Sequence, residues 1–169
     1  MISRTEGVVT VARQPRPTWQ SLAPTLSRWG LRALQVFAVP LPLALLTFAV
    51  FLPALFNGFV EWDDQINLTE NLEYRGLGKA QLRYFFTTVL MGHYIPLTWL
   101  TFGLDYVLWG MNPVGYHLSS LLIYCASVVV LYFVALGVFE KATAFGKATL
   151  RLGAIAATLF FALHPLRAE

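Results

Sequence analysis

Two adjacent carboxylates, Asp63 and Asp64, are the residues whose type and position best suit chemistry in this sequence. They follow an uncharged apolar stretch, 33–55, which is long enough to cross a bilayer because about 20 apolar residues span the hydrocarbon. Ionisable groups at a membrane surface bind cations or take part in reactions more often than they hold a fold together. The sequence leaves one alternative open, in which both aspartates only cap a helix that begins near Gln65.

The composition is that of a membrane protein. Hydrophobic residues make up 57% of the chain and charged residues 12%, with a mean hydropathy of +0.60. Soluble domains carry about 25% charged residues. The apolar residues are gathered in blocks, which predicts an all-α membrane protein with the lipid bilayer as a partner and excludes a nucleic-acid-binding role.

These blocks predict a chain with three transmembrane helices. A cleaved signal peptide is the competing interpretation of the first block, but its apolar core would be shorter and nearer to the N-terminus. The third block is short, and flanking basic side chains would have to reach the interface for it to span. The predicted segments are a basic tail (1–32), helix 1 (33–55), a long loop (56–115), helix 2 (116–139), a short loop (140–151), helix 3 (152–165) and the start of a second loop (166–169).

The basic residues predict the orientation of these helices. Arginines and lysines are concentrated in the tail 1–32 and in the loop 140–151, whereas most of the charged residues in the loop 56–115 are acidic. By the positive-inside rule the N-terminus is cytoplasmic, so Asp63 and Glu169 face the opposite side. The absence of a eukaryotic targeting signal favours a bacterial inner membrane.

The long loop is predicted to contain two interfacial helices. The second helix is Pro96–Trp109, which is apolar, aromatic and too short to be assigned as a span, and which is expected to be a surface or re-entrant helix. Within the same helix Asp105 is expected to pair with Arg83 or His93. In the first helix the apolar residues recur with helical spacing and form one face: Leu82, Phe85, Phe86, Val89 and Leu90.

Four motifs in a fixed order carry a resemblance to a known family. They are Phe59-Val60-Glu61-Trp62-Asp63-Asp64 with Asn67; His93-Tyr94-Ile95-Pro96-Leu97-Thr98-Trp99-Leu100-Thr101; Asn112-Pro113-Val114-Gly115-Tyr116-His117-Leu118; and Leu163-His164-Pro165-Leu166-Arg167-Ala168-Glu169. Together they resemble the N-terminal membrane part of the TMTC-type (transmembrane and tetratricopeptide repeat-containing) proteins, which are relatives of the protein O-mannosyltransferases in the GT-C glycosyltransferase superfamily. The resemblance covers most of the chain, from Phe59 to Glu169.

The resemblance implies a GT-C-type multi-span helical bundle. Such an enzyme transfers a sugar, mannose among the candidates, from a polyprenyl-phosphate carrier to a hydroxyl of a protein or lipid acceptor outside the cytoplasm. Relatives continue into tetratricopeptide repeats, and no repeat of about 34 residues occurs here. We therefore expect the chain to be an N-terminal piece that need not be active by itself.

The resemblance also implies roles for individual residues. Asp63 matches the catalytic aspartate of the first loop and is assigned as general base, with Asp64 supporting it or helping to bind a divalent cation. No cofactor is certain. In the second site, His164 and Arg167 are candidates to contact the lipid phosphate, and Glu169 matches the second acidic position of the family.

The alternatives to these roles are structural. His164-Pro165 would then be a helix stop, with Arg167 and Glu169 solvated at the interface. His93 is a candidate for a basic substrate contact because this chain lacks the Tyr-Arg-Pro of its relatives at that position, and a hydrogen-bonded structural histidine is the competing interpretation.

Two other classes of protein compete with the enzyme. One is a non-catalytic membrane anchor or scaffold for a C-terminal tetratricopeptide repeat domain, which explains the hydrophobicity but predicts nothing about Asp63. The other is an ion transporter, which is disfavoured because helices 1 and 2 contain no Asp, Glu, Lys or Arg.

Overall fold

The computed structural model describes residues 36–164, and the chain divides into two compact units, Met1–Ala38 and Val39–Glu169. In its described part, the second unit is built of helices and contains no β-strand, which confirms the predicted all-α class. The predicted basic tail, 1–32, and the final stretch, 166–169, lie outside the described residues.

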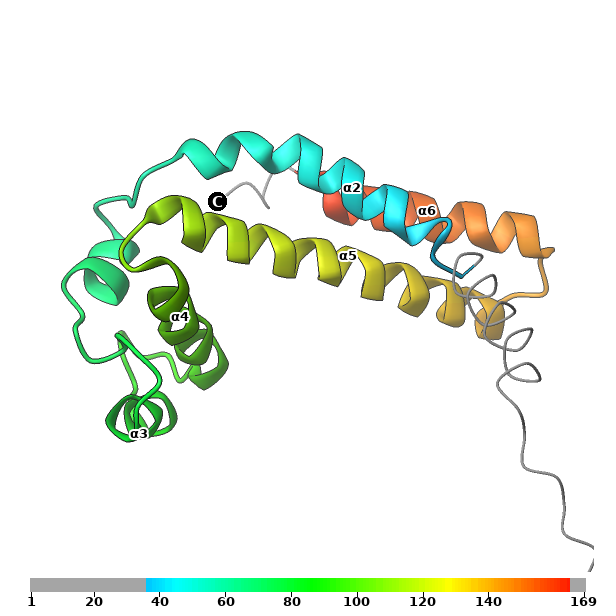
Figure 1. Cartoon of the computed structure of the whole chain (residues 1–169). Helices are drawn as coiled ribbons and strands as arrows, with labels where there is room; N and C mark the ends of the chain where they lie inside the picture. Colours follow the sequence, from blue (N-terminus) through cyan, green and yellow to red (C-terminus); the bar gives the residue numbers. More distant parts are fainter. Residues whose placement is uncertain (1–35, 165–169) are drawn as a thin grey trace, which may run out of the picture. The chain divides into compact units, whose positions relative to one another are not determined.

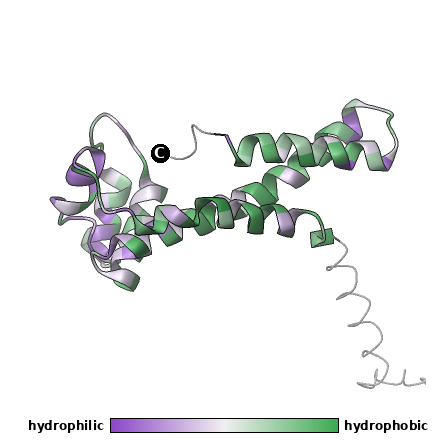
Figure 2. Cartoon of the chain, turned by 90° about the horizontal axis from the view of Figure 1, so that it is seen from above, coloured by the Kyte–Doolittle hydropathy of each residue, from purple (hydrophilic) through white to green (hydrophobic). Residues whose placement is uncertain are grey.

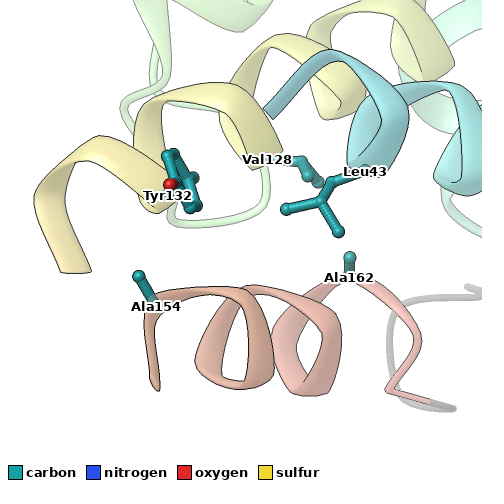
Figure 3. Packing of buried hydrophobic residues seen from close by; sticks show 5 residues of the cluster. All are labelled: Leu43, Val128, Tyr132, Ala154 and Ala162. Atoms are coloured by element: carbon teal, nitrogen blue, oxygen red, sulfur yellow. The ribbon is translucent and has the colours of Figure 1, made fainter. Parts of the chain in front are cut away.

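Three helices of this unit pack along one another: α2 (Pro40–Phe51), α5 (Pro113–Ala142) and α6 (Lys147–Ala162) (Figure 1). Helix α5 contacts both of the others and runs antiparallel to them. The core between the three helices, which we call the bundle core, is shown in Figure 3. It consists of the buried residues Leu43, Val128, Tyr132, Ala154 and Ala162.

Small side chains on α6, and threonine hydroxyls that hydrogen-bond within their own helices, allow α2 and α6 to pack closely in this core. Ala154 and Ala162 are fully buried, as small residues at helix contacts in membrane proteins often are. The buried hydroxyls of Thr47 and Thr158 donate to the carbonyl four residues earlier, over 2.8 Å and 2.7 Å. No polar side-chain group of these two residues is therefore left unpaired in the apolar interior.

Helix α5 is the one described helix that is long and apolar enough to cross a membrane. Pro113 at its first position and the Asn112 side chain, which accepts a hydrogen bond from the Val114 N–H over 3.1 Å, start it. Its 30 residues correspond to about 45 Å, more than the roughly 30 Å of hydrocarbon. The apolar segment Pro40–Phe56 and α6 are shorter, so the three-span bundle stays a prediction.

The hydropathy of the chain follows this arrangement. Figure 2 shows hydrophobic residues along the three packed helices and hydrophilic residues in the segment between α2 and α5 and at the turn between α5 and α6. An apolar middle with two polar ends is the distribution that a bilayer favours.

The segment between the end of α2 and the start of α5 has its own core. It contains η2 (Gln65–Thr69), which is a single turn of π-helix, then α3 (Lys79–Thr87) and α4 (Pro96–Trp109). Five buried residues bring these elements and the first turn of α5 together, and we call them the aromatic cluster: Leu68, Tyr74, Phe85, Trp99 and Tyr116.

Helix α3 is shorter than the apolar face predicted for the first interfacial helix. Helix α3 ends at Thr87, so Val89 and Leu90 lie beyond it. Phe85 is fully buried in the aromatic cluster, whereas its neighbour Phe86 is 52% exposed. The apolar residues of α3 therefore point in two directions, because α4 covers one side of the helix.

Helix α4 has the predicted bounds, and glycine fixes its end and its packing. Gly110 follows its last residue with φ +62°, a conformation that L side chains rarely adopt. A Cβ on Gly103 would lie 2.7 Å from both the Gly76 carbonyl oxygen and the Phe85 ring. A side chain at position 103 would therefore separate α4 from the rest of the aromatic cluster.

Candidate functional site

The two neighbouring aspartates have different environments. The Trp62 N–H donates to the Val60 carbonyl over 2.9 Å, and the Val60 N–H donates to Asp64 Oδ2 over 3.0 Å. The Asp64 carboxylate thus closes the short loop that contains Asp63. Asp63 itself is exposed and accepts no hydrogen bond from any residue in 36–164. Of the two carboxylates, Asp63 is the one left free to meet a substrate.

The helix-cap alternative does not describe these residues. Asp64 occupies the cap position of η2, but its side chain makes no capping hydrogen bond to that turn. It bonds backwards to Val60 instead. Asp64 therefore supports the loop, and Asp63 contributes nothing to the cap.

The loop that carries Asp63 is anchored at both ends in the aromatic cluster. On one side, the Phe59 ring packs edge-on against Tyr116, with 5.3 Å between the ring centroids. On the other side, Leu68 in η2 is 4% exposed. Trp62, between the anchors, is 80% exposed. The cluster thus presents Trp62 and Asp63 together at the surface.

Inside the cluster, two tyrosine hydroxyls are paired. The hydroxyls of Tyr74 and Tyr116 lie 3.0 Å apart, and Tyr74 also donates to Met111 Sδ over 3.5 Å. Burial raises the pKa of Tyr74 above its ordinary 10.0. Tyr74 therefore stays neutral and links the segment between α2 and α5, which we call the connecting segment, to α5.

Asp105 is buried beside this pair, at 2% exposure. It is hydrogen-bonded to the Ser119 side chain on α5, and not to Arg83 or His93 as predicted. Burial raises the pKa of its carboxyl above 3.8, and the bond to Ser119 opposes that rise. Ser119 also accepts a hydrogen bond from Trp109 Nε1 over 3.3 Å, so these polar groups fasten α4 to α5.

Of the other predicted site residues, the structure describes His93 and His164. His93 is exposed in the turn between α3 and α4, where its backbone pairs with Leu90 in both directions. It shares no hydrogen bond with Asp63 or Asp64, and its ring is free of the aromatic cluster. His164 follows α6, half-buried, with its ring edge-on to Phe160 at 5.4 Å. Arg167 and Glu169 lie outside the described residues.

Tyr124 on α5 contacts the last turns of both α2 and α6, the helices from which the chain continues to Asp63 and to His164. Its hydroxyl donates to the carbonyls of Phe161 and Ala162, over 3.2 Å and 3.0 Å, in the last turn of α6. Its ring also packs edge-on against Phe51, the last residue of α2, at 5.7 Å. The segments that lead to Asp63 and to His164 therefore start from the same end of the bundle.

The described residues do not assemble a metal site. No group of three or more His, Cys, Asp or Glu side chains within 36–164 is placed to hold an ion. The predicted help of Asp64 in binding a divalent cation stays a prediction.

One group that sequence reasoning missed is Arg75. Its guanidinium bonds to η2 and lies over the Tyr106 ring. Its position after the acidic Glu70 and Glu73 gave no periodic or motif signal, since its partners are backbone carbonyls. Only the folded course of the connecting segment shows what it binds.

Within residues 36–164, the fold and the site define a helical protein with one helix long and apolar enough to cross a membrane and with an exposed carboxylate on an anchored loop. Within that class, the chain is 31% identical over 132 residues to Protein O-mannosyl-transferase Tmtc1 of Drosophila melanogaster. The match covers 73% of this chain and 14% of the Drosophila protein. It supports a TMTC-like relationship and, with α5, indicates a membrane protein. No protein-family model and no solved structure matches the chain.

Proposed function

We propose that this protein is a GT-C-type membrane glycosyltransferase that moves a sugar from a polyprenyl-phosphate carrier to an acceptor hydroxyl of a protein or lipid. The observation that carries the proposal is the similarity to a protein named an O-mannosyl-transferase, which makes mannose the first sugar to test. The chain spans only 14% of that relative, so the activity belongs to the proposal and not to the comparison.

Asp63 is the general base in this proposal. The acceptor hydroxyl gives its proton to the Asp63 carboxylate while its oxygen attacks the anomeric carbon of the sugar. The bond between that carbon and the phosphate oxygen breaks, and the lipid phosphate leaves as an anion. The exposure of Asp63 and its lack of a hydrogen-bond partner within 36–164 support this role, because a base must be open to the hydroxyl that it deprotonates.

The leaving phosphate needs positive charge or hydrogen-bond donors. His164 and Arg167 are proposed to supply them, with Glu169 orienting the donor or acceptor. His93 is proposed as an additional basic contact at the turn between α3 and α4. The common level at which α2 and α6 end supports a site that draws on both segments. The distribution of basic residues supports placing it on the extracytoplasmic side, with the N-terminus in the cytoplasm.

The test is transfer from labelled polyprenyl-phosphate sugars, mannose first, by membranes that contain the wild type or Asp63→Asn. Loss of general-base catalysis lowers the rate by about 10² to 10⁴-fold, so Asp63→Asn should be close to inactive. Glu61→Gln is the matched control, because Glu61 is also exposed and also carries one negative charge two residues away.

Each result decides between the proposals. An inactive Asp63→Asn beside an active Glu61→Gln, at equal membrane levels, supports Asp63 as the base. Equal transfer by the wild type and Asp63→Asn removes Asp63 from the mechanism. If the wild type transfers no sugar from any polyprenyl-phosphate donor, the enzyme proposal fails and the membrane scaffold becomes the better explanation.

A further inference from the structure

The end of η2, which follows Asp63 and Asp64 directly, is held by one guanidinium. Arg75 Nη2 donates to the Thr69 carbonyl over 2.8 Å and lies 3.4 Å from the Leu68 carbonyl. Leu68 and Thr69 are the last two residues of this turn. The final carbonyls of a helical turn have no partner within it, and Arg75 satisfies them with charge-assisted hydrogen bonds.

The same guanidinium rests on α4. Its central carbon lies 5.6 Å from the centroid of the Tyr106 ring, within the range of a cation–π contact. Its Nε is buried and has no hydrogen-bond partner among the described residues. Arg75 therefore bonds to η2 and contacts the Tyr106 ring of α4, and it links the two elements.

This link bears on the loop that carries Asp63. Asp64 closes the loop by accepting from Val60, and Phe59 anchors its start. At its far end the anchors are the Leu68 side chain and the Arg75 guanidinium. Without the guanidinium, η2 would keep a single apolar anchor and its two last carbonyls would turn to water.

We propose that Arg75 is a positioning residue of the proposed transferase site, which fixes η2 against α4 and thereby sets the position of Asp63. The inference rests on the proposed function only for its effect on catalysis. Its structural part, that Arg75 holds η2, stands independently of any activity.

The first experiment measures amide exchange in the intact protein, comparing the wild type with Arg75→Gln and Arg75→Lys. The reporter is the Glu70 N–H, which donates to the Gln65 carbonyl over 2.9 Å across η2. Loss of the charge-assisted bond should speed its exchange about tenfold in Arg75→Gln. Arg75→Lys should be intermediate, because an ammonium lacks the planar fork that lies on Tyr106.

The control is Arg83→Gln, which removes the same charge from the exposed face of α3 and should leave the Glu70 exchange unchanged. Unchanged exchange in Arg75→Gln, or equal acceleration in Arg83→Gln, would overturn the inference. If Arg75→Gln folds poorly, Arg75→Lys takes its place: faster Glu70 exchange than in the wild type supports the inference, and wild-type exchange overturns it.

The second experiment is a double-mutant comparison of transfer rates. A positioning residue acts through Asp63, so Arg75→Gln should lower kcat about tenfold in the wild type and change it less than about twofold in the Asp63→Asn background. Equal effects in both backgrounds would show a general loss of folded protein and refute the positioning role.

A rise in KM for the sugar donor in Arg75→Gln, at unchanged kcat and unchanged Glu70 exchange, would show that Arg75 binds the donor. That result would also refute the positioning role. If Asp63→Asn is itself fully active, Asp63 is not the general base and the catalytic part of the inference is refuted; if the wild type transfers no sugar, the proposed function fails. In both cases the exchange experiment still decides whether Arg75 holds η2.

Discussion

Replacing Tyr124 by phenylalanine should loosen the end of α6 without disturbing the rest of the bundle. The Tyr124 hydroxyl is the group that pairs with the carbonyls of Phe161 and Ala162, at 3.2 Å and 3.0 Å. Phenylalanine keeps the ring and therefore keeps the edge-on contact with Phe51. The change isolates the hydrogen bond from the packing.

The expected loss follows from the chemistry of this contact. One neutral hydrogen bond contributes about 0.5–1.5 kcal/mol net, and a carbonyl left unpaired in a partly buried place adds to its loss. We expect a decrease of about 1–2 kcal/mol in the free energy of unfolding. For a chain of this length such a decrease corresponds to a fall in Tm of about 2–8 °C.

The assay is thermal unfolding of the detergent-solubilised protein together with amide exchange at Leu163, whose N–H donates to the Leu159 carbonyl over 2.9 Å. Tyr124→Phe should lower Tm and speed that exchange. Tyr132→Phe is the control, since Tyr132 is buried on the same helix and its hydroxyl bonds to none of the described residues. Equal shifts for Tyr124→Phe and Tyr132→Phe would refute the argument that this hydrogen bond holds α6.

Two further changes test the aromatic cluster. Gly103→Ala should lower stability by about 1–3 kcal/mol, because its methyl group would lie 2.7 Å from the Gly76 oxygen and the Phe85 ring. Gly137→Ala is the control and should be neutral or stabilising, because nothing lies within 4 Å of the new methyl group. Thermal melts that rank the two variants the other way would contradict the packing. Burial raises the pKa of Asp105, so its carboxyl favours folding below pH 3.8 and this contribution is lost as the pH rises through the folded-state pKa. As the pH rises above 3.8, the Tm of the wild type should therefore fall more than that of Asp105→Asn, and parallel pH profiles would contradict this assignment.

The parts of the fold that the sequence predicts are those with local signals. Helix α4 begins at Pro96 and ends before Gly110, and both residues act through their own backbone conformations. Helix α5 is recognisable from one long apolar run with Asn112-Pro113 at its start. The buried face of α3 was not predictable in the same way. Phe85 is buried and Phe86 exposed because of where α4 packs, and the sequence of α3 alone does not specify this.

The candidate site divides along the same line. Asp63 is recognisable from its type and its place after an apolar block, but the difference between Asp63 and Asp64 is not, since it arises from a bond to the Val60 backbone. Arg75 has backbone partners in η2, and a π-turn has no sequence signature that would place them. The role of a residue whose partners are backbone atoms therefore cannot be predicted from the sequence.

The two cores of the second unit suggest how stability and activity separate. The bundle core and the aromatic cluster share no buried residue, and Tyr116, at the start of α5, is where the cluster joins the bundle. Substitutions such as Val128→Ala should therefore lower the stability of the helices while the loop of Asp63 keeps its anchors. A change at Phe59 acts on the loop directly, because the Phe59 ring rests on Tyr116. If Phe59→Ala lowered kcat no more than Val128→Ala does at equal loss of stability, the aromatic cluster would not be what positions Asp63.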